Sequence, residues 1–159
     1  MARIFSARID YLLIKQLSAN FSAIANSFEQ PEGESENFLD TRTGRVIKIN
    51  YARKWDEEMV ATRLLIDSDR GGRYVAIPRP ESRVIVRDMA DFAKTVQDAR
   101  VRKALERALI GHRRLHNFIV ALGHYTPERM RWHAFKDARM HERVLKWMES
   151  VGIALVETE

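Results

Sequence analysis

Residues 38–49 constrain the fold most, because they have the pattern of a β-hairpin. Two strand-like runs are joined by residues 40–44, and Gly44 can adopt the positive φ that such a loop requires near its end. Asp40 can accept backbone N–H bonds across the turn, and three β-branched residues follow in the return strand. Most of the remaining chain has helical periodicity, so the hairpin indicates an α+β fold.

The predicted architecture is a small antiparallel sheet, the hairpin plus one or two further strands, packed against several helices. The third strand is expected at residues 74–77, and the C-terminal half is expected to be helical. We predict a single domain over residues 1–159 and an edge strand near the end, at residues 153–156. The helices are expected at residues 7–28, at 55–67, from Ser82 or Glu81, at 98–122 and from Thr126.

Two of these helices carry specific expectations about their buried faces. In the helix at residues 55–67, Met59, Leu64 and Leu65 are expected to point inward. In the helix after Asp98, the spacing of the apolar residues predicts one buried row: Val101, Leu105, Leu109, Leu115, Ile119 and Leu122.

The composition excludes several classes of protein. The chain has no cysteine, which rules out disulfides, thiolate metal sites and a cysteine nucleophile. Charged residues interrupt the N-terminus too early for a signal peptide, and no apolar run approaches the roughly 20 residues needed to cross a bilayer. We therefore expect a cytoplasmic protein without a membrane partner.

The net charge of +5 is concentrated in the C-terminal half. Residues 101–159 contain eleven lysines and arginines against seven aspartates and glutamates, and they contain all five histidines. Such a basic region can attract phosphate-rich partners, whereas solvated faces of ordinary helices are the alternative.

The best candidate for a binding surface interleaves arginines with aromatic residues at positions 129–139. Arginine contacts phosphates and aromatic rings stack on bases, so this mixture is typical of single-strand or RNA binding. The alternative is that Trp132 anchors the core and the arginines cover its rim. The predicted partner-binding residues are Arg113, Arg114, Arg129, Arg131, Trp132 and Arg139.

Two histidine patterns have the spacing of metal ligands. His112 and His116 are one helical turn apart, and His133, Asp137 and His141 are spaced four and four. Packed or exposed histidines are the alternative, and Asp137 can equally cap a helix. We predict no catalytic, cofactor-binding or metal-binding residues.

Several motifs in order along residues 24–156 resemble the UPF0158 family of uncharacterised bacterial proteins. The matching motifs are the run at 38–47, the runs at 73–78, 89–92 and 104–109, Phe118, Arg131 with Trp132, and the run at 147–153. Gly111 and Met148 depart from the expected pattern. The resemblance implies a small bacterial cytosolic α+β protein, and it carries no established reaction or site.

The predicted function is a non-enzymatic protein–protein interaction or regulatory module that binds an unknown protein or forms a homo-oligomer. One alternative is a nucleic-acid-binding accessory protein that uses the basic C-terminal helices. A metal-dependent hydrolase using His133, Asp137 and His141 is the other alternative.

Overall fold

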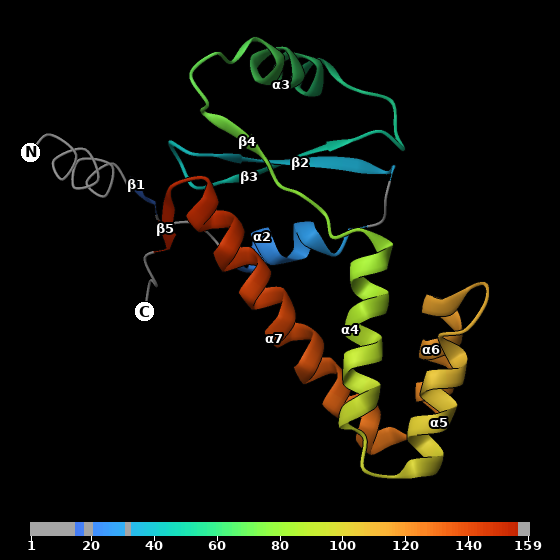
Figure 1. Cartoon of the computed structure of the whole chain (residues 1–159). Helices are drawn as coiled ribbons and strands as arrows, with labels where there is room; N and C mark the ends of the chain where they lie inside the picture. The colour runs from blue at the N-terminus through green and yellow to red at the C-terminus, as the bar shows by residue number, and fades with distance from the viewer. Residues whose placement is uncertain (1–14, 18–20, 31–32, 156–159) are drawn as a thin grey trace, which may run out of the picture. The chain divides into compact units, whose positions relative to one another are not determined.

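The computed structural model describes residues 15–17, 21–30 and 33–155. They form an α+β protein with a helical C-terminal half, as predicted (Figure 1). The chain divides into two compact units. Unit 1 contains the described residues up to Arg79 and from Arg143 onward, and unit 2 contains Pro80–Glu142.

Unit 1 contains a three-stranded antiparallel sheet, which confirms the predicted sheet. Its strands are β2 (Ser35–Asp40), β3 (Val46–Asn50) and β4 (Tyr74–Ala76), in the order β3-β2-β4. Leu39 pairs with Val46 on one side and with Val75 on the other. Leu39 is fully buried and is part of the core of this unit.

The hairpin turn between β2 and β3 forms as the sequence predicts. Gly44 has a φ of 72°, and its N–H donates to the Asp40 carbonyl at 2.8 Å. The Asp40 carboxylate accepts the Arg42 N–H at 2.9 Å. It also accepts two bonds from Arg73, at 3.0 Å from Nε and at 2.7 Å from Nη2. This ion pair ties the turn to the start of β4.

Helix α3 (Glu57–Ser68) lies on one face of the sheet, and α2 (Phe21–Phe28) lies on the other (Figure 1). Asp56 caps α3 by accepting the Met59 N–H at 2.8 Å. The expectation that Leu64 and Leu65 point inward was wrong, because both are exposed. The sheet-facing side of α3 carries polar Arg63 instead, whose guanidinium bonds to Glu36 on β2 at 2.6 Å.

The predicted helix over residues 7–28 was confirmed over Phe21–Phe28, which form α2, and was wrong over Lys15–Leu17. Residues Lys15–Leu17 form strand β1, which pairs in parallel with β5 (Ile153–Leu155), and α2 starts only at Phe21. Pairing with the distant C-terminal segment outweighs the local helical periodicity. Residues 7–14 and 18–20, and Val156 of the predicted edge strand, lie outside the described residues.

Unit 2 is helical, and its core is rich in aromatic rings. It contains α4 (Ser82–Thr95), α5 (Ala99–Ala108), α6 (Arg114–Gly123) and the first part of α7 (Thr126–Ser150). Asp98 caps α5 as predicted, accepting the Arg100 N–H at 2.8 Å. The buried cluster comprises Met89, Phe92, Ala93, Val96, Val101, Leu105, Phe118, Leu122 and Trp132.

The predicted single helix over residues 98–122 was wrong, because the structure contains two helices, α5 and α6. Gly111 (φ 82°) and Arg113 (φ 57°) take left-handed backbone conformations that a continuous helix cannot contain. The break changes which side chains are buried. Leu115 and Ile119, expected in the buried row, are exposed.

Helix α7 is continuous from Thr126 to Ser150, so it starts where the sequence predicts. Asp137 therefore lies inside a helix and does not cap one. Among the residues that the structure describes, no helix combines the length and hydropathy needed to span a membrane.

Candidate functional site

The loop that separates α5 from α6 is held in a defined shape. The side-chain Nδ2 of Asn117 donates to the His112 carbonyl at 3.0 Å, and the Asn117 backbone N–H donates to the Arg113 carbonyl at 2.9 Å. Arg114 Nε donates to the Gly111 carbonyl at 3.1 Å. These bonds hold Arg113 in its left-handed conformation at the N-terminus of α6.

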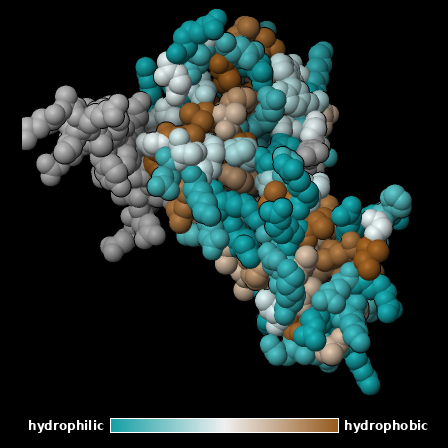
Figure 2. Space-filling view, in the orientation of Figure 1, coloured by the Kyte–Doolittle hydropathy of each residue, from teal (hydrophilic) through white to brown (hydrophobic). Residues whose placement is uncertain are grey.

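Large apolar side chains are exposed on this loop and on α6. Ile110 is 74% exposed, and Ile119 and Val120 are each 51% exposed. Leu115 and Ile119 are four residues apart and share one side of the helix, and Val120 is rotated by about 100° from Ile119. Figure 2 shows hydrophobic surface in this region. We call the following set the basic apolar surface: Ile110, Arg113, Arg114, Leu115, Ile119 and Val120.

The charge of this surface is entirely positive. No aspartate or glutamate occurs between Glu106 and Glu128, whereas Arg107, Arg113 and Arg114 fall within that stretch. Arg113 is exposed, and its side chain forms no ion pair with any residue that the structure describes. Two of the six predicted partner-binding residues, Arg113 and Arg114, therefore lie together with exposed apolar side chains.

The remaining predicted arginines are placed differently. Arg129 is exposed. Arg131 forms an ion pair with Glu128, donates to Thr95 Oγ1 at 3.1 Å and lies 5.6 Å from the centroid of the Phe92 ring.

Arg139 has a similar position on α7. It lies 3.4 Å from the Asp91 carboxylate and 5.1 Å from the centroid of the Phe135 ring. Arg131 and Arg139 thus cover the rim of the aromatic core, which limits their availability to a partner.

Trp132 is a core residue with only 3% of its surface exposed. Its ring centroid lies 5.3 Å from those of Phe92 and Phe118 and 6.0 Å from that of Phe135. A ring that stacks on a nucleic-acid base needs an exposed face. The burial of Trp132 instead matches the alternative interpretation, in which its ring anchors the core.

The histidines do not gather into a metal site. His112 precedes α6 and His116 lies within it, so the two are not on one helical face. His133 and His141 lie on α7 eight residues apart, about 12 Å along the axis, which is too far for a single ion. The described residues contain no group of three or more histidines and carboxylates that could hold a metal.

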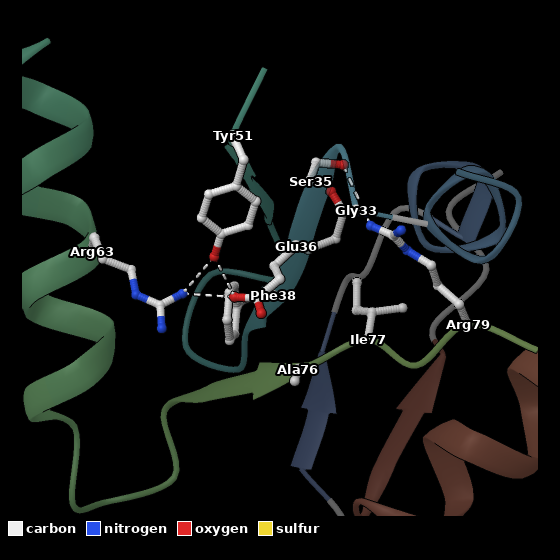
Figure 3. Close-up of a pocket in the computed structure, with 10 residues that line it drawn as sticks. Gly33, Ser35, Glu36, Phe38, Tyr51, Arg63, Ala76, Ile77 and Arg79 are labelled. Carbon is white, nitrogen blue, oxygen red and sulfur yellow. Dashed lines mark hydrogen bonds and ion pairs between the residues drawn. The ribbon is translucent and has the colours of Figure 1, made fainter. Parts of the chain in front are cut away.

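A second site candidate is a pocket of about 540 Å³ in unit 1 (Figure 3). Arg63 of α3 points toward Glu36 and Tyr51, and its Nη1 bonds to Glu36 Oε2 at 2.6 Å and to the Tyr51 hydroxyl at 3.2 Å. The Tyr51 hydroxyl donates to the same Glu36 oxygen at 2.7 Å. Arg63 also pairs with Asp67 at 2.9 Å, so two carboxylates neutralise its charge.

These contacts fix the protonation states in the pocket. The hydrogen bonds from Tyr51 and Arg63 lower the pKa of Glu36, so it stays ionised near neutral pH. Partial burial and the bond to Glu36 raise the pKa of Tyr51, so it stays protonated. The same hydrogen bonds tie α3 to the sheet, because Arg63 lies on α3 and Glu36 lies on β2.

Comparison with protein families identifies the family of this chain. The model of UPF0158, described as an uncharacterised protein family, matches residues 13–159. The chain belongs to this family. Neither the curated proteins nor the solved structures compared with the UPF0158 chain include a significant match.

Sequence reasoning missed the apolar half of the basic apolar surface. It placed Leu115 and Ile119 in a buried row because it extended one helix through Gly111. The usable signal was Gly111 itself, which follows α5 closely and marks the helix end.

Proposed function

We propose that this UPF0158 protein is a non-enzymatic protein–protein interaction module that acts in the cytoplasm and binds its partner through the basic apolar surface. The observation that carries this proposal is the exposure of Ile110, Leu115, Ile119 and Val120 on one loop and one short helix. Contiguous exposed apolar residues are uncommon on a monomer and are typical of interaction sites.

The arginines of the surface define the kind of partner. Arg113 and Arg114 flank the apolar residues, and Arg107 lies on the preceding helix. Arginine is enriched at protein interfaces, where it pairs with carboxylates and packs its apolar stem. A partner with apolar residues beside acidic ones fits this surface best.

The test compares proteins captured by three baits from a lysate of the source cells. The baits are the wild type, Ile119→Glu, and Leu145→Glu as a matched control at another exposed apolar residue. We expect Ile119→Glu to lose at least about ten-fold of the captured partner, because a central apolar contact is replaced by a charge. The proposal fails if all three baits capture the same proteins equally.

Nucleic-acid binding is the second candidate, and the acid-free stretch between Glu106 and Glu128 favours it. Fluorescence anisotropy with single-stranded and duplex RNA and DNA across a salt series distinguishes the two candidates. A nucleic-acid site predicts affinity that falls steeply with salt and disappears in Arg113→Glu/Arg114→Glu. A protein site predicts no binding to these probes at physiological salt.

A further inference from the structure

Helix α3 presents a second exposed apolar face, in unit 1. Leu64 is 64% exposed and Leu65 is 59% exposed, and none of the twelve residues of α3 is buried. Val60 and Leu64 are one turn apart, as are Ala61 and Leu65, so these residues form one stripe. Figure 2 shows hydrophobic surface over this helix.

The charges beside this stripe are negative. Glu57 and Glu58 occupy the first turn of α3 and Asp67 lies in its last turn, all of them exposed. The helix has one basic residue, Arg63, and its guanidinium bonds to Glu36 on the sheet and to Asp67. We call the set Glu57, Glu58, Val60, Ala61, Leu64 and Leu65 the acidic apolar face.

The acidic apolar face and the basic apolar surface complement each other. Helix α3 has 12 residues and α6 has 10, so both are about 15–18 Å long. Each presents a stripe of exposed aliphatic side chains, one beside glutamates and the other beside arginines. Opposite charges around matching apolar stripes favour association and fix its orientation.

We propose that α3 of one copy of this protein binds the basic apolar surface of a second copy. The inference rests on the proposed function, because it names a partner for the same surface. Pairing α3 with α3 would bring glutamates together, and pairing α6 with α6 would bring Arg113 and Arg114 together. Only α3 against α6 places opposite charges in contact.

Contact between two different surfaces has a structural consequence. In a head-to-tail pair, one copy retains a free α6 and the other retains a free α3. Assembly can then continue beyond two chains. Two short helices give an interface below the standard size, so we expect dissociation constants in the micromolar range or weaker.

The experiment uses one variant for each surface. Leu64→Glu/Leu65→Glu blocks the acidic apolar face and Ile119→Glu blocks the basic apolar surface, and all three residues are exposed, so folding is retained. Sedimentation velocity is recorded from about 1 to about 500 µM, a range that spans the expected affinity. Far-UV circular dichroism verifies the fold of each variant.

We expect the mass of the wild type to rise with concentration and each variant alone to remain a monomer. A mixture of the two variants should form a complex of two chains and stop there, because it contains one intact copy of each surface. Leu145→Glu, the matched control, should associate like the wild type.

A wild type that stays a monomer, or a mixture of the two variants that does, overturns the inference. If the wild type stays a monomer while its capture of another protein still depends on Ile119, self-association is wrong and the proposed function stands. If Ile119→Glu also captures the same proteins as the wild type, both are wrong.

Discussion

At the scale of single residues, one contact of Asp40 could be predicted from the sequence and another could not. Its position before a glycine-containing loop predicts bonds to the turn, and the carboxylate accepts the Arg42 N–H. Its bidentate partner Arg73 lies far away in the sequence, and no local pattern connects the two. Local turn chemistry was predictable, whereas the ion pair depends on strand pairing.

Replacing Asp40 by alanine should destabilise the protein by about 2–3 kcal/mol, because a largely buried acceptor disappears and several donors lose their partner. Urea unfolding measures this change. Arg42→Ala is the control: its side chain is exposed and forms no ion pair with described residues, so we expect a change within about 0.5 kcal/mol. Equal effects of the two substitutions would contradict the assigned role of Asp40.

Asp40 should also make stability depend on pH. The hydrogen bonds from Arg73 hold the pKa of Asp40 well below its usual range. Its contribution is therefore fully present above the unfolded-state pKa of about 3.9 and is lost as the pH falls below that value. In urea titrations, the wild type should lose more stability than Asp40→Asn between about pH 5 and about pH 2. Parallel losses would show that Asp40 is not linked to folding.

Trp132 was predicted both as a stacking residue and as a core residue, and the sequence left the choice open. The structure surrounds it with Phe92, Phe118 and Phe135. We therefore expect Trp132→Ala to lower the free energy of unfolding by about 3–5 kcal/mol, as for large core truncations. A loss below about 1 kcal/mol in urea unfolding would place Trp132 at the surface instead.

At the scale of helices and strands, elements with strong local signals were predictable. The Thr126 start of α7 and the Asp98 cap of α5 follow from capping residues next to them in the chain. The break after α5 was missed because the apolar spacing continues across it. Strand β1 was missed because its partner β5 lies at the other end of the chain.

The left-handed conformation of Arg113 gives a prediction for the loop before α6. A non-glycine residue at φ 57° is strained, so Arg113→Gly should stabilise the protein by about 0.5–1 kcal/mol. The melting temperature should rise by about 2–4 °C, while partner capture weakens because an interface arginine is lost. Arg114→Gly, at the first residue of α6, removes no positive φ and should instead destabilise the protein, by less than about 1 kcal/mol. Destabilisation by both substitutions would contradict strain at Arg113.

At the scale of the whole molecule, the α+β class and the family were predictable from the sequence. The chain forms two compact units. A single domain over residues 1–159 therefore remains a prediction, and it requires that the two units unfold together. Helix α7 belongs to both, since its residues up to Glu142 are in unit 2 and the rest are in unit 1. A helix shared by two units favours cooperative unfolding, because melting it removes part of both.

We therefore expect one unfolding transition, which tryptophans in different units can report. Trp132 lies in unit 2, and Trp147 lies in unit 1. Phenylalanine replaces Trp55 and Trp147 in one variant, and Trp55 and Trp132 in the other, so that each variant retains a single tryptophan. Both variants are unfolded in urea, and fluorescence is compared with circular dichroism. Coincident curves are expected for a single domain, and a fluorescence midpoint that differs from the circular dichroism midpoint would indicate two.

The claim that the basic apolar surface binds protein is tested most directly by photo-crosslinking in living cells. A benzophenone amino acid replaces Ile119 in one variant and Leu145 in another, since both positions are exposed and apolar. We predict discrete protein adducts from position 119 and none above background from position 145. Equal yields from the two positions, or adducts to nucleic acid alone, would contradict a protein-binding role for this surface.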